Sequence, residues 1–261
     1  MTDFIKYEVR DGIAHVTIDR PEKRNAMNYA MLADFYATMK QAGREEGTYA
    51  VVIEGTGGAF CAGTDLTDLG NADDAIAAQK AGIPEDGQVP FIIGACPRPV
   101  IAAVDGPAMG MGAEFGTQCD VRIASTNAKF GFVFVLRGLV SDTGAGSFLL
   151  PQIVGATEAL RLLMSGEVID AHRALELGLV TQVVAPQDLA AAAEEEAKRY
   201  ANASPFAVGR TKQLVYGAMH NGLDVHLRET TRLLNECFRS EDHAEGVAAF
   251  LERRPAKFTG R

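Results

Sequence analysis

Two acidic residues in glycine-rich, apolar surroundings are the side chains of this sequence best suited to acid–base chemistry. Asp142 follows FVLRGLVS and precedes TGAGSF, and Glu114 lies in GAEF. A carboxyl group in an apolar pocket can carry a proton near neutral pH, because burial disfavours its charged form. Phe132, Phe134 and Leu136 are expected to bury Asp142 and raise its pKa. A helix start nearby would lower that pKa, so the net direction is open.

Asp142 also has structural interpretations that involve no chemistry. It could be the N-cap of a helix that begins after it, since aspartate is a common N-cap residue. Alternatively, Arg137 could form a salt bridge with one of the two acids, which would make that acid a structural charge.

Two glycine-rich loops offer backbone N–H groups that could work beside such an acid. They are AFCAGTDL, residues 59–66, and GPAMGMGAEFG, residues 106–116, which leads into an expected helix. Small residues let a ligand approach the backbone, and N–H groups at a helix start favour negative charge. Two such loops at strand ends predict an oxyanion hole, in which N–H groups stabilise charge on a carbonyl oxygen. The simpler alternative is that both loops are only tight turns. The glycines lack the spacing of a dinucleotide-binding motif.

Strands, glycine-rich loops and helices alternate along the chain, and this order predicts an α/β fold. The expected strands are residues 4–10 and 13–19, which form a hairpin, and 50–55, 99–106, 119–125 and 128–134. The expected helices are residues 28–44, 185–204, 223–238 and 242–254. The polar residues 67–90 are expected to form a mobile insertion or lid over the site.

Composition narrows the class of protein. The 261 residues are 47% hydrophobic, enough for one large domain or two small ones. The net charge of −9 argues against a nucleic-acid partner. No apolar run approaches about 18 residues and no signal peptide is apparent, so we expect no membrane span and a cytoplasmic protein. The scattered cysteines and histidines predict reduced thiols and no metal site.

Seven segments, in a fixed order, resemble segments of a known superfamily. They are RPEKRNAMN, GAFCAGTDL, PVIAAVDGPAMGMGAEF, CDVRIAS, AKFGF, ALELGLVTQVV and FLERRPAKFTGR. Together they resemble the crotonase superfamily, the enoyl-CoA hydratases and isomerases, over nearly the whole chain. The resemblance implies a crotonase-like spiral of ββα units with an acyl-CoA site over residues 1–200. It implies a C-terminal helical trimerisation region over residues 201–261, which also contacts CoA. The implied assembly is a homotrimer or a hexamer, a dimer of trimers. The implied substrate is a coenzyme A thioester, with no other cofactor.

The resemblance also implies roles for individual residues. The oxyanion N–H groups fall on Thr64 and Met111, where Met111 departs from the usual glycine, although any residue except proline keeps the donor. The implied CoA-binding residues are Lys23, Arg24, Ala62, Asp65, Phe250 and Arg253. The implied acyl-pocket residues are Met109, Phe132 and Phe134. The simpler alternative is that the basic residues are solvated charges and that Phe250 belongs to the core.

The two carboxylates decide which reaction the resemblance implies. Glu114 matches the first of the two glutamates of the hydratases, but Phe134 stands where the second would be. Asp142 stands where hydratases usually have glycine and some isomerases have aspartate. The favoured reaction is therefore an enoyl-CoA isomerisation with Asp142 as the acid/base and Glu114 as its auxiliary. Three alternatives stay open: a hydratase that uses Glu114, a hydrolase or dehalogenase with Asp142 as nucleophile, and a non-catalytic acyl-CoA-binding protein.

Overall fold

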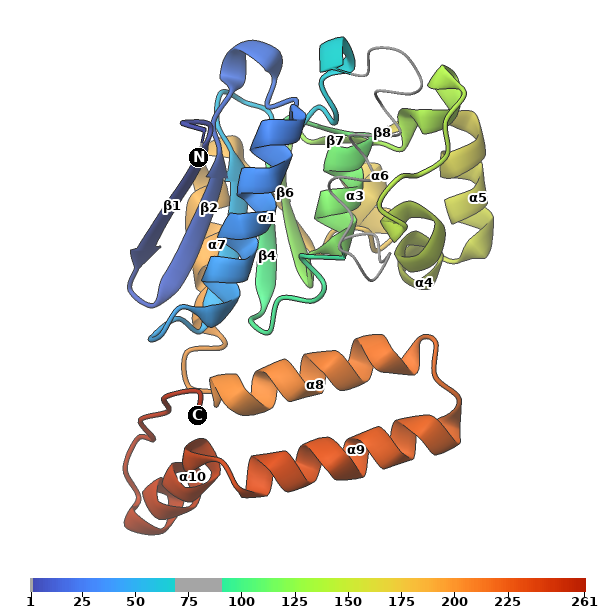
Figure 1. Ribbon diagram of the computed structural model, residues 1–261. Coiled ribbons are helices and arrows are strands. Elements are labelled where there is room, and N and C mark those ends of the chain that lie inside the picture. Colours follow the sequence, from blue (N-terminus) through green and yellow to red (C-terminus); the bar gives the residue numbers. More distant parts are fainter. Residues whose placement is uncertain (1, 69–90) are drawn as a thin grey trace.

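A six-stranded, mostly parallel sheet forms the centre of the computed structural model, which describes residues 2–68 and 91–261 (Figure 1). The strand order is β1-β2-β3-β4-β6-β9. The strands are β1 (Ile5–Arg10), β2 (Ile13–Ile18), β3 (Ala50–Gly55), β4 (Val100–Val104), β6 (Val121–Ser125) and β9 (Gln182–Val184). β1 and β2 form the expected antiparallel hairpin, and each later neighbour pairs in parallel. The expected α/β class is confirmed, whereas residues 69–90 of the expected lid lie outside the described residues.

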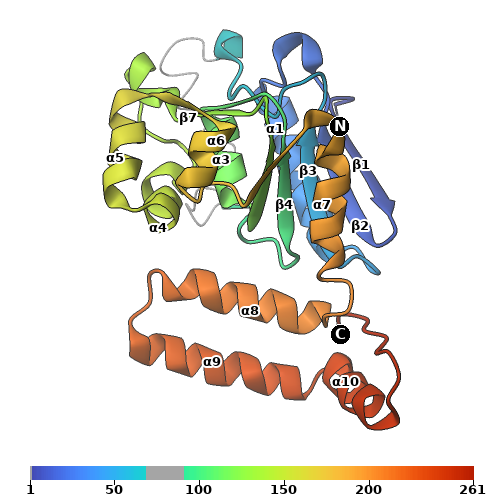
Figure 2. The same ribbon diagram turned by 180° about the vertical axis from the view of Figure 1, so that it is seen from behind.

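Helices cover both faces of this sheet because its central strands are apolar on both sides. Along β3, Val51 and Ile53 belong to one core cluster and Ala50 and Val52 to the other, as expected for side chains that alternate between faces. The first cluster packs against α1 (Tyr29–Arg44) and the second against α7 (Leu189–Lys198). Figures 1 and 2 show these two helices on opposite faces of the sheet.

A smaller three-stranded sheet and several short helices stand at one end of the main sheet. The strand order of the smaller sheet is β5-β7-β8, with β5 (Pro107–Met109), β7 (Lys129–Gly131) and β8 (Val168–Asp170). The helices are α3 (Met111–Gln118), α4 (Leu150–Val154), α5 (Ala156–Ser165) and α6 (Ala171–Glu176). A 3-10 helix, Val133–Arg137, and a π-helical turn, Ala145–Leu149, complete this region.

Two of the expected elements are at most half as long as predicted. The strand expected over 128–134 ends at Gly131 because the chain turns into the 3-10 helix. The helix expected over 185–204 spans only Leu189–Lys198, after a short 3-10 turn at Pro186–Asp188.

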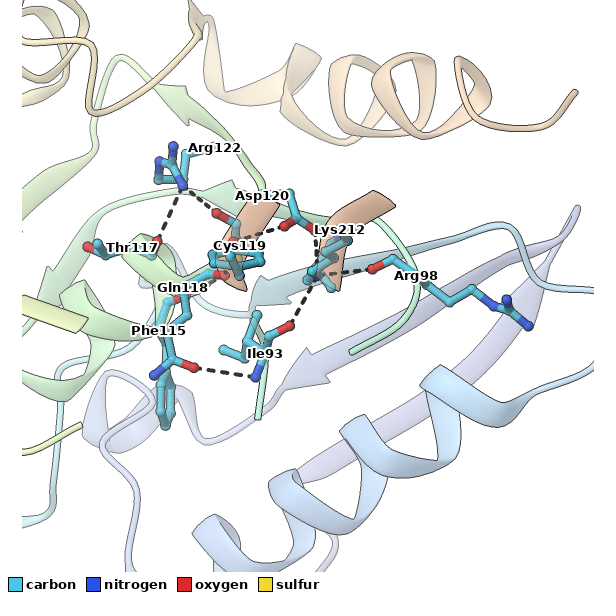
Figure 3. A network of polar contacts seen from close by, with 11 residues as sticks. Ile93, Arg98, Phe115, Thr117, Gln118, Cys119, Asp120, Arg122 and Lys212 are labelled. Carbon is cyan, nitrogen blue, oxygen red and sulfur yellow. Dashed lines mark hydrogen bonds and ion pairs between the residues drawn. The ribbon is translucent and has the colours of Figure 1, made fainter. Parts of the chain in front are cut away.

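Three C-terminal helices form a layer beside this core, α8 (Pro205–Ala218), α9 (Leu223–Phe238) and α10 (Glu241–Glu252), with α8 nearest the core (Figure 2). Figure 3 shows the polar network that anchors α8. Lys212 Nζ lies 2.6 Å from Asp120 Oδ2 and donates to the carbonyl oxygens of Ile93 and Arg98 at 3.3 and 3.1 Å. The Tyr216 hydroxyl donates to Asp120 Oδ1 at 3.0 Å. Asp120 therefore joins α8 to the loop between α3 and β6.

Candidate active site

The turn after β3 lies between two other segments of the chain. Cys61 forms a parallel bridge with Ala108 of β5, and Thr64 forms one with Met27. The Met27 N–H donates to the Gly63 carbonyl at 2.8 Å, and the Asp65 N–H donates to the Met27 carbonyl at 2.8 Å. In such a bridge the partner bonds to the residues on either side of Thr64. The N–H of Thr64 itself therefore faces away from Met27.

The turn that carries Thr64 lies against the start of α3, next to Met111. A Cβ atom on Gly63, which has φ +95°, would lie 2.8 Å from the Met109 carbonyl oxygen and 3.6 Å from the Met111 nitrogen. Thr64 Oγ1 lies 3.9 Å from Met111 Sδ. Within the described parts of the chain, neither the Thr64 nor the Met111 N–H donates to a protein acceptor. Met111 is the first residue of α3, where N–H groups are free and the helix dipole is positive. The two amides can therefore stabilise a negative oxygen.

Glu114 lies one helical turn after Met111 and is fully buried. Its Oε2 accepts from the Thr143 N–H at 3.0 Å, and its Oε1 accepts from the Gly146 N–H at 2.6 Å. Both oxygens thus hold the turn at residues 141–146 against α3. A Cβ on Gly146 would lie 2.9 Å from Glu114 Oε1 and would collide with the Ser141 hydroxyl, so a side chain at this position would have to displace them.

Asp142 lies on that turn beside Glu114. Burial raises the pKa of Asp142, and the Glu114 carboxyl group raises it further, while backbone N–H groups of Asp142 and Thr143 oppose the rise. Asp142 Oδ1 is shielded from solvent and has no hydrogen-bond partner among the described residues. The net direction that the sequence left open is therefore upward. A largely enclosed carboxyl group with a free oxygen and a raised pKa can accept and return a proton near neutral pH.

Both structural interpretations of Asp142 are wrong. The π-helical turn that follows has Gly144 as its N-cap, and Thr143 Oγ1 accepts locally from the Ala145 N–H at 3.3 Å. Arg137 is exposed and forms no ion pair with either acid in the described structure.

Tyr36, on α1, is a residue near the two acids that the sequence did not assign to the site. Burial raises the pKa of Tyr36 well above its usual value, and the charges of Asp142 and Glu114 add to the rise. The phenol thus lies within electrostatic range of both carboxyl groups. Phe35, its neighbour on α1, stacks on Phe115 of α3 at 5.0 Å between ring centroids. Apolar periodicity marked this helix face as core, so the sequence did not single out the Tyr36 hydroxyl as a site group.

The expected acyl-pocket residues have different surroundings. The Phe134 ring lies 3.8 Å from where a Cβ of Gly110 would be, so it covers the loop that leads to Met111. Met109 is partly exposed, whereas Phe132 is buried in the main core cluster. The prediction that Leu136 buries Asp142 is wrong. Leu136 is 60% exposed and packs beside Gly166, because the 3-10 helix turns it outward.

The residues expected to bind CoA lie in two groups. Lys23 and Arg24 are exposed, and the Ala62 N–H donates to the Arg24 carbonyl at 3.0 Å. The Asp65 carboxylate is buried against Arg20, with 2.9 Å between Arg20 Nη1 and Asp65 Oδ2. Phe250 and Arg253 lie at the end of α10, in the C-terminal layer. Phe250 is 82% exposed, so the alternative that it belongs to the core of this chain is wrong.

The described residues show no cluster of metal-ligating side chains. Within the same residues, no helix has both the length and the apolar character needed to cross a membrane.

The comparisons with known proteins agree with this fold. The family model for enoyl-CoA hydratase/isomerase matches residues 8–261. The chain is 37% identical to the 1,2-epoxyphenylacetyl-CoA isomerase of Escherichia coli K12 over all of both proteins. It is 37% identical to a probable enoyl-CoA hydratase of Rhodobacter capsulatus over 98% of each. The crystal structure of an enoyl-CoA hydratase from Bacillus anthracis superposes with a TM-score of 0.89 at 28% identity, over 99% of this chain and 100% of that one. The chain belongs to the enoyl-CoA hydratase/isomerase family and has the crotonase fold. It is thus an enzyme of a family that acts on acyl-CoA.

Proposed function

We propose that this enzyme is an enoyl-CoA isomerase in which Asp142 moves a proton between two carbons of a CoA thioester. The observation that carries the proposal is the enclosed Asp142 Oδ1, which has no hydrogen-bond partner among the described residues, together with the Thr64 and Met111 amides, which donate to no acceptor among them. Glu114 is less suited to this role, because both of its oxygens already accept backbone N–H groups. It serves as an auxiliary that holds the turn and raises the pKa of Asp142.

The proposed mechanism begins when the thioester oxygen accepts hydrogen bonds from the Thr64 and Met111 N–H groups. Asp142 takes a proton from C2 of a 3-enoyl-CoA, and the C–H electron pair delocalises as a dienolate onto that oxygen. The same carboxyl group returns the proton to C4, so the double bond moves to C2–C3 and no water is consumed. The two amides stabilise the charge only while it exists, which is the condition for catalysis by an oxyanion hole. This proton transfer needs no further cofactor.

A hydratase that uses Glu114 is the second candidate, since several relatives carry that name. Addition of water needs one group to activate the water and another to deliver a proton. Phe134, which cannot ionise, stands where the second hydratase glutamate would lie, and this favours the isomerase.

We also propose roles for the residues outside the reacting centre. Lys23, Arg24, Ala62 and Asp65 would hold the CoA moiety, and Met109, Phe132 and Phe134 would shape the acyl pocket. The division into residues 1–200, which hold the acyl-CoA site, and residues 201–261, which form contacts between subunits, is part of the same proposal. Exposed apolar residues of α10, Phe250 at 82% and Leu251 at 74%, support a trimer or hexamer in which they and Arg253 meet another subunit and its CoA.

Product analysis tests the reaction type. A series of 3-enoyl-CoA and 2-enoyl-CoA thioesters is incubated with the enzyme, and the products are separated by liquid chromatography with mass detection. The isomerase predicts 2-enoyl-CoA from 3-enoyl-CoA without a gain in mass. Formation of 3-hydroxyacyl-CoA at a comparable rate would favour the hydratase, and a covalent adduct on Asp142 would favour the nucleophilic alternative.

A further inference from the structure

The segment at residues 20–27 fixes the turn at residues 56–65, which carries the Thr64 amide. Three backbone hydrogen bonds join the two segments around Thr64: Ala62 N–H to the Arg24 carbonyl, Met27 N–H to the Gly63 carbonyl, and Asp65 N–H to the Met27 carbonyl. These bonds set the direction of the Thr64 N–H, because they occupy the groups on both sides of it. What holds the segment at residues 20–27 in place therefore also aims the Thr64 amide.

The side chain of Asn25 joins the segment at residues 20–27 to the beginning of the turn at residues 56–65. It is fully buried, and its Oδ1 accepts from the Arg20 N–H at 2.8 Å. Its Nδ2 donates to the carbonyl oxygens of Thr56 and Ala59 at 2.9 and 2.7 Å. Asn25 has φ +61°, a left-handed conformation that asparagine tolerates better than most residues. One amide thus satisfies three backbone groups, two of them in the turn.

The ion pair of Arg20 and Asp65 joins the same two segments at a second place. It connects the first residue of the segment at 20–27 to the last residue of the turn at 56–65. Their ion pair is largely buried, with side-chain exposures of 14% and 7% and a separation of 2.9 Å between Arg20 Nη1 and Asp65 Oδ2. Arg20 Nη1 also donates to the Ala26 carbonyl at 3.1 Å. Asp65 directly follows Thr64, so this ion pair fixes the chain on the other side of the amide.

We propose that Asn25 and the Arg20–Asp65 pair are positioning residues that aim the Thr64 N–H at the thioester oxygen. This inference rests on the proposed function, because it takes Thr64 as an oxyanion donor. Phe60 and Cys61 anchor the middle of the turn in the core, and the two ties fix the chain on either side of them, up to the residue after Thr64. An amide that is displaced by a fraction of an ångström loses much of its effect on the transition state. Substrate binding is affected less, because other residues still hold the CoA moiety.

Two kinds of variant test the inference. Asn25→Asp keeps the acceptor for the Arg20 N–H but replaces the donor to two carbonyl oxygens with an acceptor. Asp65→Asn removes the charge from the ion pair and provides a second variant if Asn25→Asp folds poorly. Both should lower kcat by about 10- to 100-fold, because the loss falls on the transition state. Asn25→Asp should change KM by less than about threefold, whereas Asp65→Asn should also raise KM, because Asp65 is proposed to hold the CoA moiety as well.

Asn28→Ala is the matched control. Asn28 lies in the same segment and also uses its amide, but its Oδ1 accepts from the Met31 N–H to cap α1 at 2.8 Å. Its loss should lower the free energy of unfolding by about 1 kcal/mol and leave kcat unchanged. A merely structural role of Asn25 would give the same pattern as this control.

Infrared spectroscopy of bound hexanoyl-CoA, labelled with carbon-13 at the thioester carbonyl, gives a direct readout. Two N–H donors polarise the carbonyl, so its stretching band should shift to lower wavenumber in the wild type and in Asn28→Ala. The shift should be reduced in Asn25→Asp and Asp65→Asn. If the wild type shows no shift, the oxyanion hole is wrong and the inference fails with it. If both variants keep the full shift and the wild-type kcat, the inference alone is overturned.

Discussion

Asp142 and Glu114 are neighbours, yet their surroundings give them different roles. Two backbone N–H groups bind the two oxygens of the Glu114 carboxyl group, which fixes its position. Asp142 has an enclosed oxygen without a partner in the described structure, and both burial and the adjacent acid raise its pKa. When two neighbouring acids have such different surroundings, the difference is the usual basis for assigning their acid–base roles.

The pH dependence of activity should report this coupling. A side-chain hydrogen bond with Glu114 and the Glu114 charge both raise the pKa of Asp142, so replacing Glu114 should let Asp142 ionise at lower pH. We expect Glu114→Gln to move the acidic limb of the kcat/KM profile to lower pH, still above the value of about 3.9 for free aspartate because burial persists. Glu195→Gln, at an exposed site on α7, should leave the limb in place. An unchanged or higher limb in Glu114→Gln would show that the two acids are not coupled.

The raised pKa of Asp142 also has a consequence for stability. Asp142 binds its proton more tightly in the folded protein than in the unfolded chain. Ionisation of Asp142 should therefore destabilise the fold as pH rises through the folded pKa. We expect Asp142→Asn to melt at a higher temperature than the wild type near pH of about 9 and to lose this advantage near pH of about 4. Calorimetry over that range measures it, and an advantage confined to acidic pH would contradict the sign.

For individual residues, the sequence predicted which side chains form the site better than it predicted what they contact. Asp142 and Glu114 stand out because acids are rare in apolar, glycine-rich stretches. Their proximity depends on α3 and the turn at residues 141–146, which are 23 or more residues apart in sequence. The sequence did not indicate Tyr36 as a site residue, because it lies on the apolar, periodic face of α1. Leu136 was misplaced because a single 3-10 helix reverses which side chains face inward.

Helix α3 and the turn after β3 approach so closely at Gly112 that no side chain fits there. A Cβ on Gly112 would collide with the Cys61 carbonyl and lie 2.8 Å from Cys61 Cβ. Gly116, one turn later in the same helix, has no atom within 4 Å of its would-be Cβ. The contact at Gly112 therefore sets the spacing between the two proposed oxyanion donors.

Alanine at these two glycines should have opposite effects. Gly112→Ala must push α3 away from the turn, so we expect kcat/KM to fall by at least about tenfold and the melting temperature to drop. Gly116→Ala should keep the activity and stabilise the protein by up to about 1 kcal/mol, since alanine is the better helix former. Steady-state kinetics and thermal unfolding measure both. Equal activity of the two variants would mean that the close contact does not set the geometry of the site.

The sequence predicted long elements with strong patterns and missed short ones. The hairpin and α1 could be predicted from alternation and from helical periodicity. β5, β8 and β9 have only three residues each, too few to show a pattern, and they form because distant segments pair with them. The strand expected at 128–134 ends at Gly131 because the chain turns there into the 3-10 helix.

In the whole molecule, a small number of polar contacts among the described residues join the sheet core to the C-terminal layer of α8, α9 and α10. Lys212 is 9% exposed and meets Asp120 and two carbonyl oxygens of the core (Figure 3). Removing one partner of a buried ion pair leaves the other without compensation. The attachment of α8 to the core therefore depends strongly on this lysine.

Lys212→Met should weaken that attachment. We expect a loss of about 3 kcal/mol in the free energy of unfolding, at the low end for buried pairs because Asp120 is partly exposed. Lys198→Met, at an exposed position on α7, should change it by less than about 0.5 kcal/mol. Urea unfolding measures both, and equal losses would show that the network does not anchor α8.

Hydrogen exchange in deuterium oxide tests the central claim most directly, namely that Asp142 carries the proton of an oxyanion-stabilised dienolate. A 3-enoyl-CoA is incubated with the wild type, Asp142→Asn and Glu114→Gln, and deuterium at C2 and C4 is followed by NMR together with the double-bond shift. The account predicts exchange and isomerisation by the wild type. It predicts a loss of both by about 100-fold or more in Asp142→Asn, with measurable activity left in Glu114→Gln. Exchange by Asp142→Asn at the wild-type rate would contradict it.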